Sequence, residues 1–333
     1  MRLLLAIATC VSLAAQGAGS VSTIISVVRT ALEHGQTDAQ LARVLHRVKP
    51  AEALDMRTVE ELENLGAGPR TLTELEHIRE ISAGLPAPID PSPFPTPAPP
   101  SEIEQQRTIE TARASAITYE KSLPDFICTE VVRRYNDSIG KQVDTLELKV
   151  SFFGQKESYQ LLTINKKRTS RTYDSIGGTI TQGEFGSLLN EVFALRSETE
   201  FRWDHWTNIR RRPTLAFYFR VRAGRSRYRM QAGTRFSHYE AVVGQHGFVY
   251  IDAETHQTVR VFAEAESIPS DFPVRSAMTK LDYGFVDIGE RRFLLPLHAE
   301  TQMQAEDNTR NDVQFLDYKK FSSDATITFE PGK

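Results

Sequence analysis

Apolar residues change their spacing along the chain. Between residues 21 and 85 they recur three or four positions apart, and TDAQ at 37–40 forms a capping box, a usual start of a helix. From residue 126 onwards, short segments alternate apolar and polar residues and are separated by turn sequences such as NDSIGK at 136–141. The first pattern predicts a small helical module, and the second predicts a series of strands.

The segment QVDTLELKVSFF at 142–153 illustrates the alternation. Its apolar side chains share one face and its charged side chains share the other, which is typical of antiparallel sheet with one buried face. Further strands are expected at 126–135, 158–164, 214–221, 247–251, 258–265, 277–288, 291–305 and 312–321. Helical spacing returns at 101–119 and at 183–198. We therefore predict the α+β class, with a single long antiparallel sheet that carries a helix or two on its apolar face.

The first twenty residues, MRLLLAIATCVSLAAQGAGS, are typical of a secretory signal peptide. They combine a cation at Arg2, a short apolar run and a tail of small residues. The apolar run is too short to span a bilayer. Cleavage after it would remove Cys10 and leave Cys128, so the mature chain would form no intramolecular disulfide. We expect an exported protein, periplasmic or extracellular.

A proline-rich segment, PAPIDPSPFPTPAPP at 86–100, separates the helical module from the strands. Proline lacks a backbone N–H and disrupts helix interiors and paired strands, so this segment is predicted to be a semi-rigid linker. The sequence then divides into four parts. They are a signal peptide at 1–19, a helical module at 20–85, the linker at 86–100 and a sheet domain at 101–330.

Residue types that carry catalysis lack a recognisable arrangement. The sequence has no HExxH, GxSxG, P-loop or dinucleotide-binding motif. Asp204 and His205 are adjacent, but neighbouring residues of a strand point to opposite faces, so the carboxylate cannot easily orient the imidazole. Cys128 lies among apolar residues and is interpreted as a buried side chain. We expect neither an enzyme nor a metal or cofactor site.

The segment LENLGAGPRTLTEL at 62–75 resembles the hairpin of a helix-hairpin-helix element, in which Gly66 and Gly68 would let backbone N–H groups approach a phosphate. Several glutamates surround it and would repel a phosphate backbone. With a net charge of −3, the chain has no general attraction to nucleic acid either. We interpret the segment as a tight helical turn without nucleic acid.

Arginines are concentrated between residues 210 and 229. If AGRS at 223–226 is a four-residue turn, two pairs of like charges face each other across a hairpin, Arg222 with Arg227 and Arg220 with Arg229. Like charges in that position are destabilising, so something should compensate them. The favoured candidate is an acidic neighbouring strand with Glu198, Glu200 and Asp204, and the other is an anionic surface such as lipid headgroups.

The segment GFVYIDAETHQTVRVF at 247–262 predicts two strands around a polar turn. Asp252 is placed to accept backbone N–H bonds in that turn, with Thr255 assisting. His256 stands where a left-handed residue, usually glycine or asparagine, is expected.

Two segments resemble the periplasmic lipoprotein-carrier superfamily, the LolA-like fold. These are the hairpin around Asp252 and RRFLLPLHAETQMQ at 291–304, where a Leu-Pro pair precedes alternating positions. The resemblance implies a long curved antiparallel sheet, a LolA-like half-barrel with covering helices, whose concave face takes acyl chains or lipophilic molecules. The candidate lining residues are aromatic: Phe152, Phe201, Trp203, Phe217, Phe219, Phe248 and Tyr250. The alternative is that they fill a closed core.

The function expected from the sequence is therefore non-catalytic binding of a lipophilic molecule or a lipidated protein in the cell envelope. The alternative is a scaffold with a filled core, in which the helical module binds protein partners. A cavity that stays open would favour the first, and an exposed apolar patch on the helices would favour the second.

Overall fold

The computed structural model describes residues 19–90, 92–94, 97–176, 185–234 and 237–321. The expected signal peptide lies almost wholly outside the described residues. The chain forms two compact units, here called the helical unit (Met1–Pro99 with His205–Thr214) and the sheet unit (Pro100–Asp204 with Leu215–Lys333). Among the described residues, no helix has the length and apolar content needed to cross a membrane.

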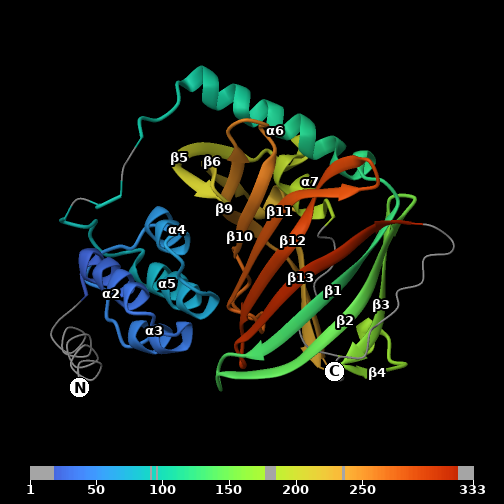
Figure 1. The fold of residues 1–333 in the computed structure, drawn as a ribbon, viewed down its shortest axis with the longest axis horizontal. Helices are drawn as coiled ribbons and strands as arrows, with labels where there is room; N and C mark the ends of the chain where they lie inside the picture. Colours follow the sequence, from blue (N-terminus) through green and yellow to red (C-terminus); the bar gives the residue numbers. More distant parts are fainter. Residues whose placement is uncertain (1–18, 91, 95–96, 177–184, 235–236, 322–333) are drawn as a thin grey trace. The chain divides into compact units, whose positions relative to one another are not determined.

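The described part of the helical unit contains four short helices (Figure 1). They are α2 (Val21–Glu33), α3 (Asp38–Leu45), α4 (Met56–Asn64) and α5 (Pro69–Ser82). The capping box predicted at Thr37 and Gln40 begins α3. The apolar residues at helical spacing form the core, in which Val28, Leu45, Leu62 and Leu75 are fully buried. The helical spacing of apolar residues therefore identified this part of the chain correctly.

The turn between α4 and α5 contains the two glycines of the hairpin-like segment, and a carboxylate from α3 closes it. Asp38 accepts hydrogen bonds from the backbone N–H groups of Arg70 (3.0 Å) and Thr71 (2.9 Å) at the start of α5. A side chain at Gly68 would approach the Asp38 carboxyl carbon to 2.6 Å. The position where a phosphate would bind a helix-hairpin-helix element is thus filled by the protein's own carboxylate.

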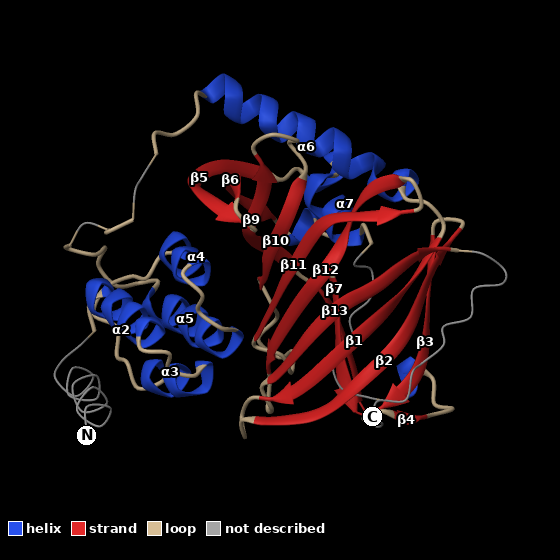
Figure 2. Cartoon of the chain, viewed as in Figure 1, coloured by secondary structure: helices blue, strands red, loops and turns tan. Residues whose placement is uncertain are grey.

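The sheet unit is built on an eleven-stranded antiparallel sheet, drawn in red in Figure 2, and the predicted fold class is confirmed. The strand order is β4-β3-β2-β1-β13-β12-β11-β10-β9-β6-β5. The strands are β1 (Phe126–Asn136), β2 (Lys141–Phe153), β3 (Lys156–Ile164), β4 (Lys167–Arg168), β5 (Glu200–Ile209), β6 (Arg212–Val221), β9 (Gly244–Asp252), β10 (Thr258–Glu266), β11 (Ser276–Ile288), β12 (Arg291–Gln304) and β13 (Thr309–Lys320). Strands β7 (Arg229–Thr234) and β8 (Ser237–Val242) form a separate two-stranded sheet.

Helices α6 (Glu102–Ser122) and α7 (Ser187–Phe193) belong to the same unit, with three short 3-10 turns, η1 (Tyr173–Ser175), η2 (Leu195–Ser197) and η3 (Ala223–Arg225). Phe185, two residues before α7, packs against one face of the sheet, called the inner face. Its ring centre lies 5.2 Å from that of Phe126 and 5.5 Å from that of Phe315. Phe152 stacks on Phe126 at 5.2 Å. This aromatic cluster fills the space between α7 and the β1–β2–β13 part of the sheet.

The hairpin around Asp252 folds as predicted. Oδ1 of Asp252 accepts hydrogen bonds from the backbone N–H of Glu254 (3.2 Å) and Thr255 (2.8 Å) and from the Thr255 hydroxyl (2.9 Å). His256 is left-handed, with φ of 54°. Both observations account for these residues as parts of a turn.

Candidate functional site

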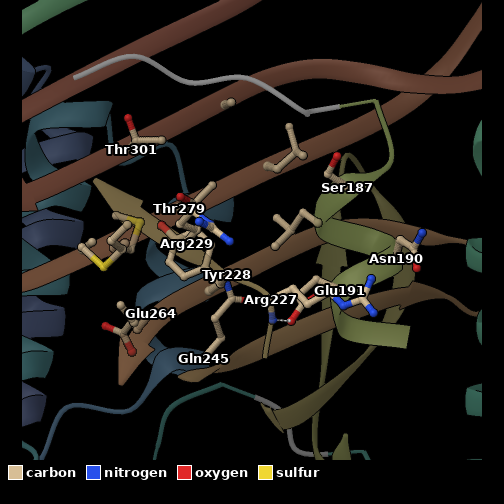
Figure 3. A pocket seen from close by; sticks show the side chains of 18 of the residues that line it. Ser187, Asn190, Glu191, Arg227, Tyr228, Arg229, Gln245, Glu264, Thr279 and Thr301 are labelled. Atoms are coloured by element: carbon tan, nitrogen blue, oxygen red, sulfur yellow. Dashed lines mark hydrogen bonds between the residues drawn. The ribbon is translucent and has the colours of Figure 1, made fainter. Parts of the chain in front are cut away.

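A cavity of about 550 Å³ lies on the inner face of the sheet unit, beside the aromatic cluster (Figure 3). Strands β10, β11 and β12 form its floor, α7 contributes Leu188 and Asn190, and β7 contributes Met230 and Gln231. All of these elements belong to one compact unit. Its volume is within the range of about 300 to 1,000 Å³ that is usual for small-molecule sites.

Small side chains create this cavity. In the register of the sheet, Ala263 of β10 pairs with Thr279 of β11, which pairs with Thr301 of β12. On either side of this row, Ala277 pairs with Met303 and Leu281 pairs with Ala299. Because alanine and threonine reach only a short way from the sheet, the space below α7 stays open here, whereas phenylalanines fill it further along.

The cavity walls are mostly apolar. Met230 of β7 is buried together with Ala277, and Tyr228 and Met303 pack against the same cluster. Methionine side chains are flexible and adapt to irregular ligands. Burial raises the pKa of the Tyr228 hydroxyl, so this group stays neutral at physiological pH. This part of the wall can contact an apolar molecule, whereas other lining residues, such as Glu191, Arg227 and Glu264, are charged.

One buried carboxylate organises the edge of the cavity below α7. Glu191 accepts a hydrogen bond from the backbone N–H of Arg227 at 2.6 Å, drawn as the dashed line in Figure 3, and one from the Arg196 guanidinium at 3.0 Å. Only 7% of Glu191 is exposed. Arg196 balances its charge, and the bond to the backbone fixes the position of residue 227 at the cavity.

Three buried polar atoms on lining residues lack a hydrogen-bond partner in the described part of the chain. One is Nε of Arg196, whose guanidinium bonds to Glu191 through another nitrogen. The other two can accept a hydrogen bond and are Oε1 of Gln245 and Oγ1 of Thr301. An unsatisfied buried polar atom costs about 1 to 3 kcal/mol. A ligand hydroxyl or amide that reached either atom after a small side-chain rotation would recover part of that cost.

None of the seven aromatic residues proposed from the sequence lines this cavity. Phe152 belongs to the aromatic cluster, Phe201 stacks on Phe193, and Trp203 meets Phe217 edge to face. Phe219 is fully buried. Phe248 and Tyr250 alternate with the inward residues of β9 and so lie on the opposite face. Their role as ligand contacts stays a prediction.

The predicted hairpin of the arginine-rich segment is wrong. Strand β6 ends at Val221, η3 follows, and β7 pairs with β8 instead of β6, so Arg229 faces Val242. The physical reason is charge, because facing arginines would repel each other whereas separate strands let most of them reach carboxylates.

Four of these arginines form ion pairs. Arg222 bonds to Glu200, which confirms the favoured acidic-strand interpretation for this residue. The other pairs are Arg220 with Glu266 (2.9 Å), Arg225 with Glu198 (2.9 Å), and Arg229 with Glu240. Binding of an anionic surface by Arg220, Arg222, Arg227 and Arg229 stays a prediction.

His205 and Cys128, the two residues considered for catalysis, are both buried, and neither is among the residues that line the cavity. Nε2 of His205 lies 2.8 Å from Oε2 of Glu60, and both side chains are buried in the helical unit. Cys128 is fully buried in β1. Over the described ranges, no group of three or more histidine, cysteine, aspartate and glutamate side chains is arranged to hold a metal ion.

The alanine floor was not identified from the sequence, although a signal for it exists. Ala263, Ala277 and Ala299 stand at inward positions of strands that carry larger aliphatic residues, such as Val261 and Leu281, at other inward positions. Three small residues at inward positions of neighbouring strands indicate missing volume. Whether that volume stays empty depends on α7, which no strand pattern reveals.

The fold and the cavity define a class of protein: α+β, with one long antiparallel sheet and a cavity under a helix on its inner face. No family model matches the chain, and no curated protein matches it. Solved structures do. A LolA superfamily protein from Nitrosomonas europaea is 10% identical with a TM-score of 0.36, over 65% of this chain and 93% of that one.

Two further solved structures are similar. A DUF1329 family protein from Desulfovibrio piger is 9% identical, with a TM-score of 0.32 over 66% of this chain and 95% of that one. A domain from Vibrio parahaemolyticus, described as an outer membrane lipoprotein-sorting protein, is 8% identical, with a TM-score of 0.33 over 66% and 94%. The chain thus has structural matches to a LolA superfamily protein and to a lipoprotein-sorting protein domain, at low sequence identity.

Proposed function

We propose that the protein binds a lipophilic molecule, or the lipid part of a lipidated protein, in the cavity below α7, without catalysis and outside the cytoplasm. The alanine floor is the observation that supports this most strongly, because it leaves a partly apolar cavity of about 550 Å³ between α7 and the sheet. A second, smaller cavity of about 300 Å³ lies beside α6 in the same unit. Export is supported by the pattern of the first twenty residues.

The energetics of such binding are favourable. Each buried methylene of an acyl chain contributes about 0.8 kcal/mol, so a dozen contribute about 10 kcal/mol gross. Loss of translational and rotational freedom removes about 4 kcal/mol or more. About 6 kcal/mol or less remains, which corresponds to a dissociation constant of about 40 μM or weaker, and polar contacts at the cavity edge would tighten it.

Lipid extraction tests the proposal. The chain from residue 19 onwards is purified without detergent, and an organic extract is analysed by mass spectrometry for lipid in stoichiometric amount. The variant Ala263→Phe places a large side chain on the cavity floor, whereas Ala114→Phe makes the same change on the exposed surface of α6. Circular dichroism confirms that both variants fold.

We expect lipid from the wild type and from Ala114→Phe, and at least a tenfold loss from Ala263→Phe, because a phenyl ring removes the space for the tail. Equal lipid in all three would place binding elsewhere. A clean extract, together with no thermal shift on adding fatty acids or phospholipids, would exclude the proposal and leave the scaffold interpretation.

A further inference from the structure

Arg227 differs from the four arginines nearest to it in sequence. Arg220, Arg222, Arg225 and Arg229 each form an ion pair with a glutamate. The guanidinium of Arg227 has no ion pair with any residue that the structure describes, although its backbone N–H is held by Glu191. Arg227 is also one of the residues that line the cavity, and it is exposed there.

The other charged residues that line the cavity are two arginines, Arg196 and Arg229, and three glutamates, Glu120, Glu191 and Glu264. Arg196 is balanced by Glu191, and Arg229 by Glu240. Glu264 lies 3.7 Å from His246, and in Figure 3 it is drawn on the far side of the cavity from Glu191. Glu120 of α6 also lines the cavity, where its side chain packs close to Gly186. Uncompensated positive charge at the cavity is therefore found at Arg227.

We infer that the ligand is a single-tailed amphiphile with an anionic head, whose tail lies on the alanine floor and whose carboxylate or phosphate is bound by Arg227. This inference rests on the proposed function and names its ligand class. The guanidinium offers several N–H donors to an oxyanion. Glu191 binds the backbone N–H of Arg227 and so fixes the backbone from which the Arg227 guanidinium extends, at the edge of the cavity.

Three probes with the same tail and different heads test the inference: dodecanoate, dodecanol and dodecylamine. Each is titrated against protein loaded with the neutral dye Nile red, and displacement of the dye reports binding. The variants are Arg227→Gln, which removes the charge, and Arg227→Lys, which keeps it. Arg225→Gln is the matched control, because Arg225 is exposed, paired with Glu198 and not among the lining residues. Circular dichroism confirms folding, and acetate measures binding of the head alone.

We expect the wild type to bind dodecanoate about tenfold more tightly than dodecanol, the effect of one charge-assisted hydrogen bond. Arg227→Gln should lose this preference while its affinity for dodecanol changes less than about twofold. Arg227→Lys should keep part of the preference for dodecanoate, and Arg225→Gln should keep all of it. Acetate should bind the wild type at least a hundredfold more weakly than dodecanoate, because it lacks the tail.

Other outcomes separate the two proposals. If dodecanol or dodecylamine binds as tightly as dodecanoate, or if Arg227→Gln keeps the preference, the anionic head is wrong while the cavity still binds lipophilic molecules. Tightest binding of dodecylamine would assign the head to Glu120 instead. If neither Nile red nor any of the three probes binds the wild type, the proposed function itself fails.

Discussion

His256 shows how a single residue can satisfy a turn at a cost. Asp252 and Thr255 make the hydrogen bonds that close the hairpin, but the backbone of residue 256 has a φ of 54°. This left-handed conformation costs a residue with a side chain about 1 to 2 kcal/mol, and glycine adopts it freely. The Nδ1 atom of His256 is also buried without a partner among the described residues.

Replacing His256 with glycine should therefore stabilise the protein, by about 0.5 to 1 kcal/mol once the greater chain entropy of glycine is included. Urea unfolding followed by circular dichroism measures the change. Glu254→Gly in the same turn is the control, because residue 254 has no positive φ and gains nothing from glycine. A loss of stability in His256→Gly equal to that of the control would contradict the strain argument.

At the scale of elements, α3 and α5 are joined by one carboxylate. Asp38 accepts the backbone N–H groups of Arg70 and Thr71 and the hydroxyl of Thr71 (2.7 Å). It acts as the N-cap that Gly68 cannot provide, since glycine has no side chain oxygen. The same contact explains the glycine, because there is no room for a side chain between residue 68 and Asp38.

We expect Asp38→Ala to destabilise the helical unit by about 1 to 2 kcal/mol, the usual effect of losing a cap. Gly68→Ala should destabilise it as well, through contact with Asp38. In the double variant Asp38→Ala with Gly68→Ala, the second substitution should cost less than it does alone. Far-UV circular dichroism in urea measures all three. Strictly additive effects would show that the two residues do not interact.

The outer face of the sheet carries a row of alternating charges across its strands. Arg260 bonds to Asp282 at 2.5 Å, His298 lies 3.9 Å from Asp282 and 3.7 Å from Asp312, and Arg133 bonds to Asp312 at 3.3 Å. Burial by itself raises the pKa of Asp312, but the hydrogen bond and charge of His298 and the charges of Arg133 and Arg310 outweigh it. The net pKa of Asp312 lies below its ordinary value.

A carboxylate whose pKa is lower in the folded state contributes stability above its unfolded pKa and loses it as the pH falls through the folded pKa. Asp312→Asn should therefore lower the free energy of unfolding at pH 7, on the order of 1 kcal/mol, and the difference from wild type should shrink below about pH 4. Urea unfolding at several pH values measures it. Asp287→Asn, in an exposed pair with Arg292, is the control and should have a smaller effect.

At the scale of the whole molecule, the buried thiol of Cys128 reports on the sheet unit. Cys128 is fully buried, so a thiol reagent reaches it only when the strands open. A ligand that binds the folded cavity suppresses opening by mass action. Dodecanoate at about ten times its dissociation constant should therefore slow labelling by about tenfold. Ala263→Phe is the control and should show no slowing, and equal slowing in both proteins would place the ligand elsewhere.

Strands and local turns could be predicted from the sequence because both are determined by neighbouring residues. Alternation in 142–153 directly reflects which side chains are buried, and the turn at Asp252 is closed by residues two and three positions away. The predicted pairing of β7 is wrong because it assumes the turn at 223–226, before β7, whereas β7 pairs with the strand that follows it, β8. The cavity depends on α7 facing three alanines that are 70 residues or more away in sequence.

For the proposed ligand, the alanine floor has a further consequence, which concerns the length of the tail. Ala263, Ala277 and Ala299 lie on three adjacent strands and leave space at the floor of the cavity. Replacing one of them with valine or leucine would shorten the tail that fits by a carbon or two and would leave Arg227 unchanged. Under the proposed function, proteins with the same fold could therefore differ in the tail length that they accept through single substitutions at the floor, while their preference for the head remains the same.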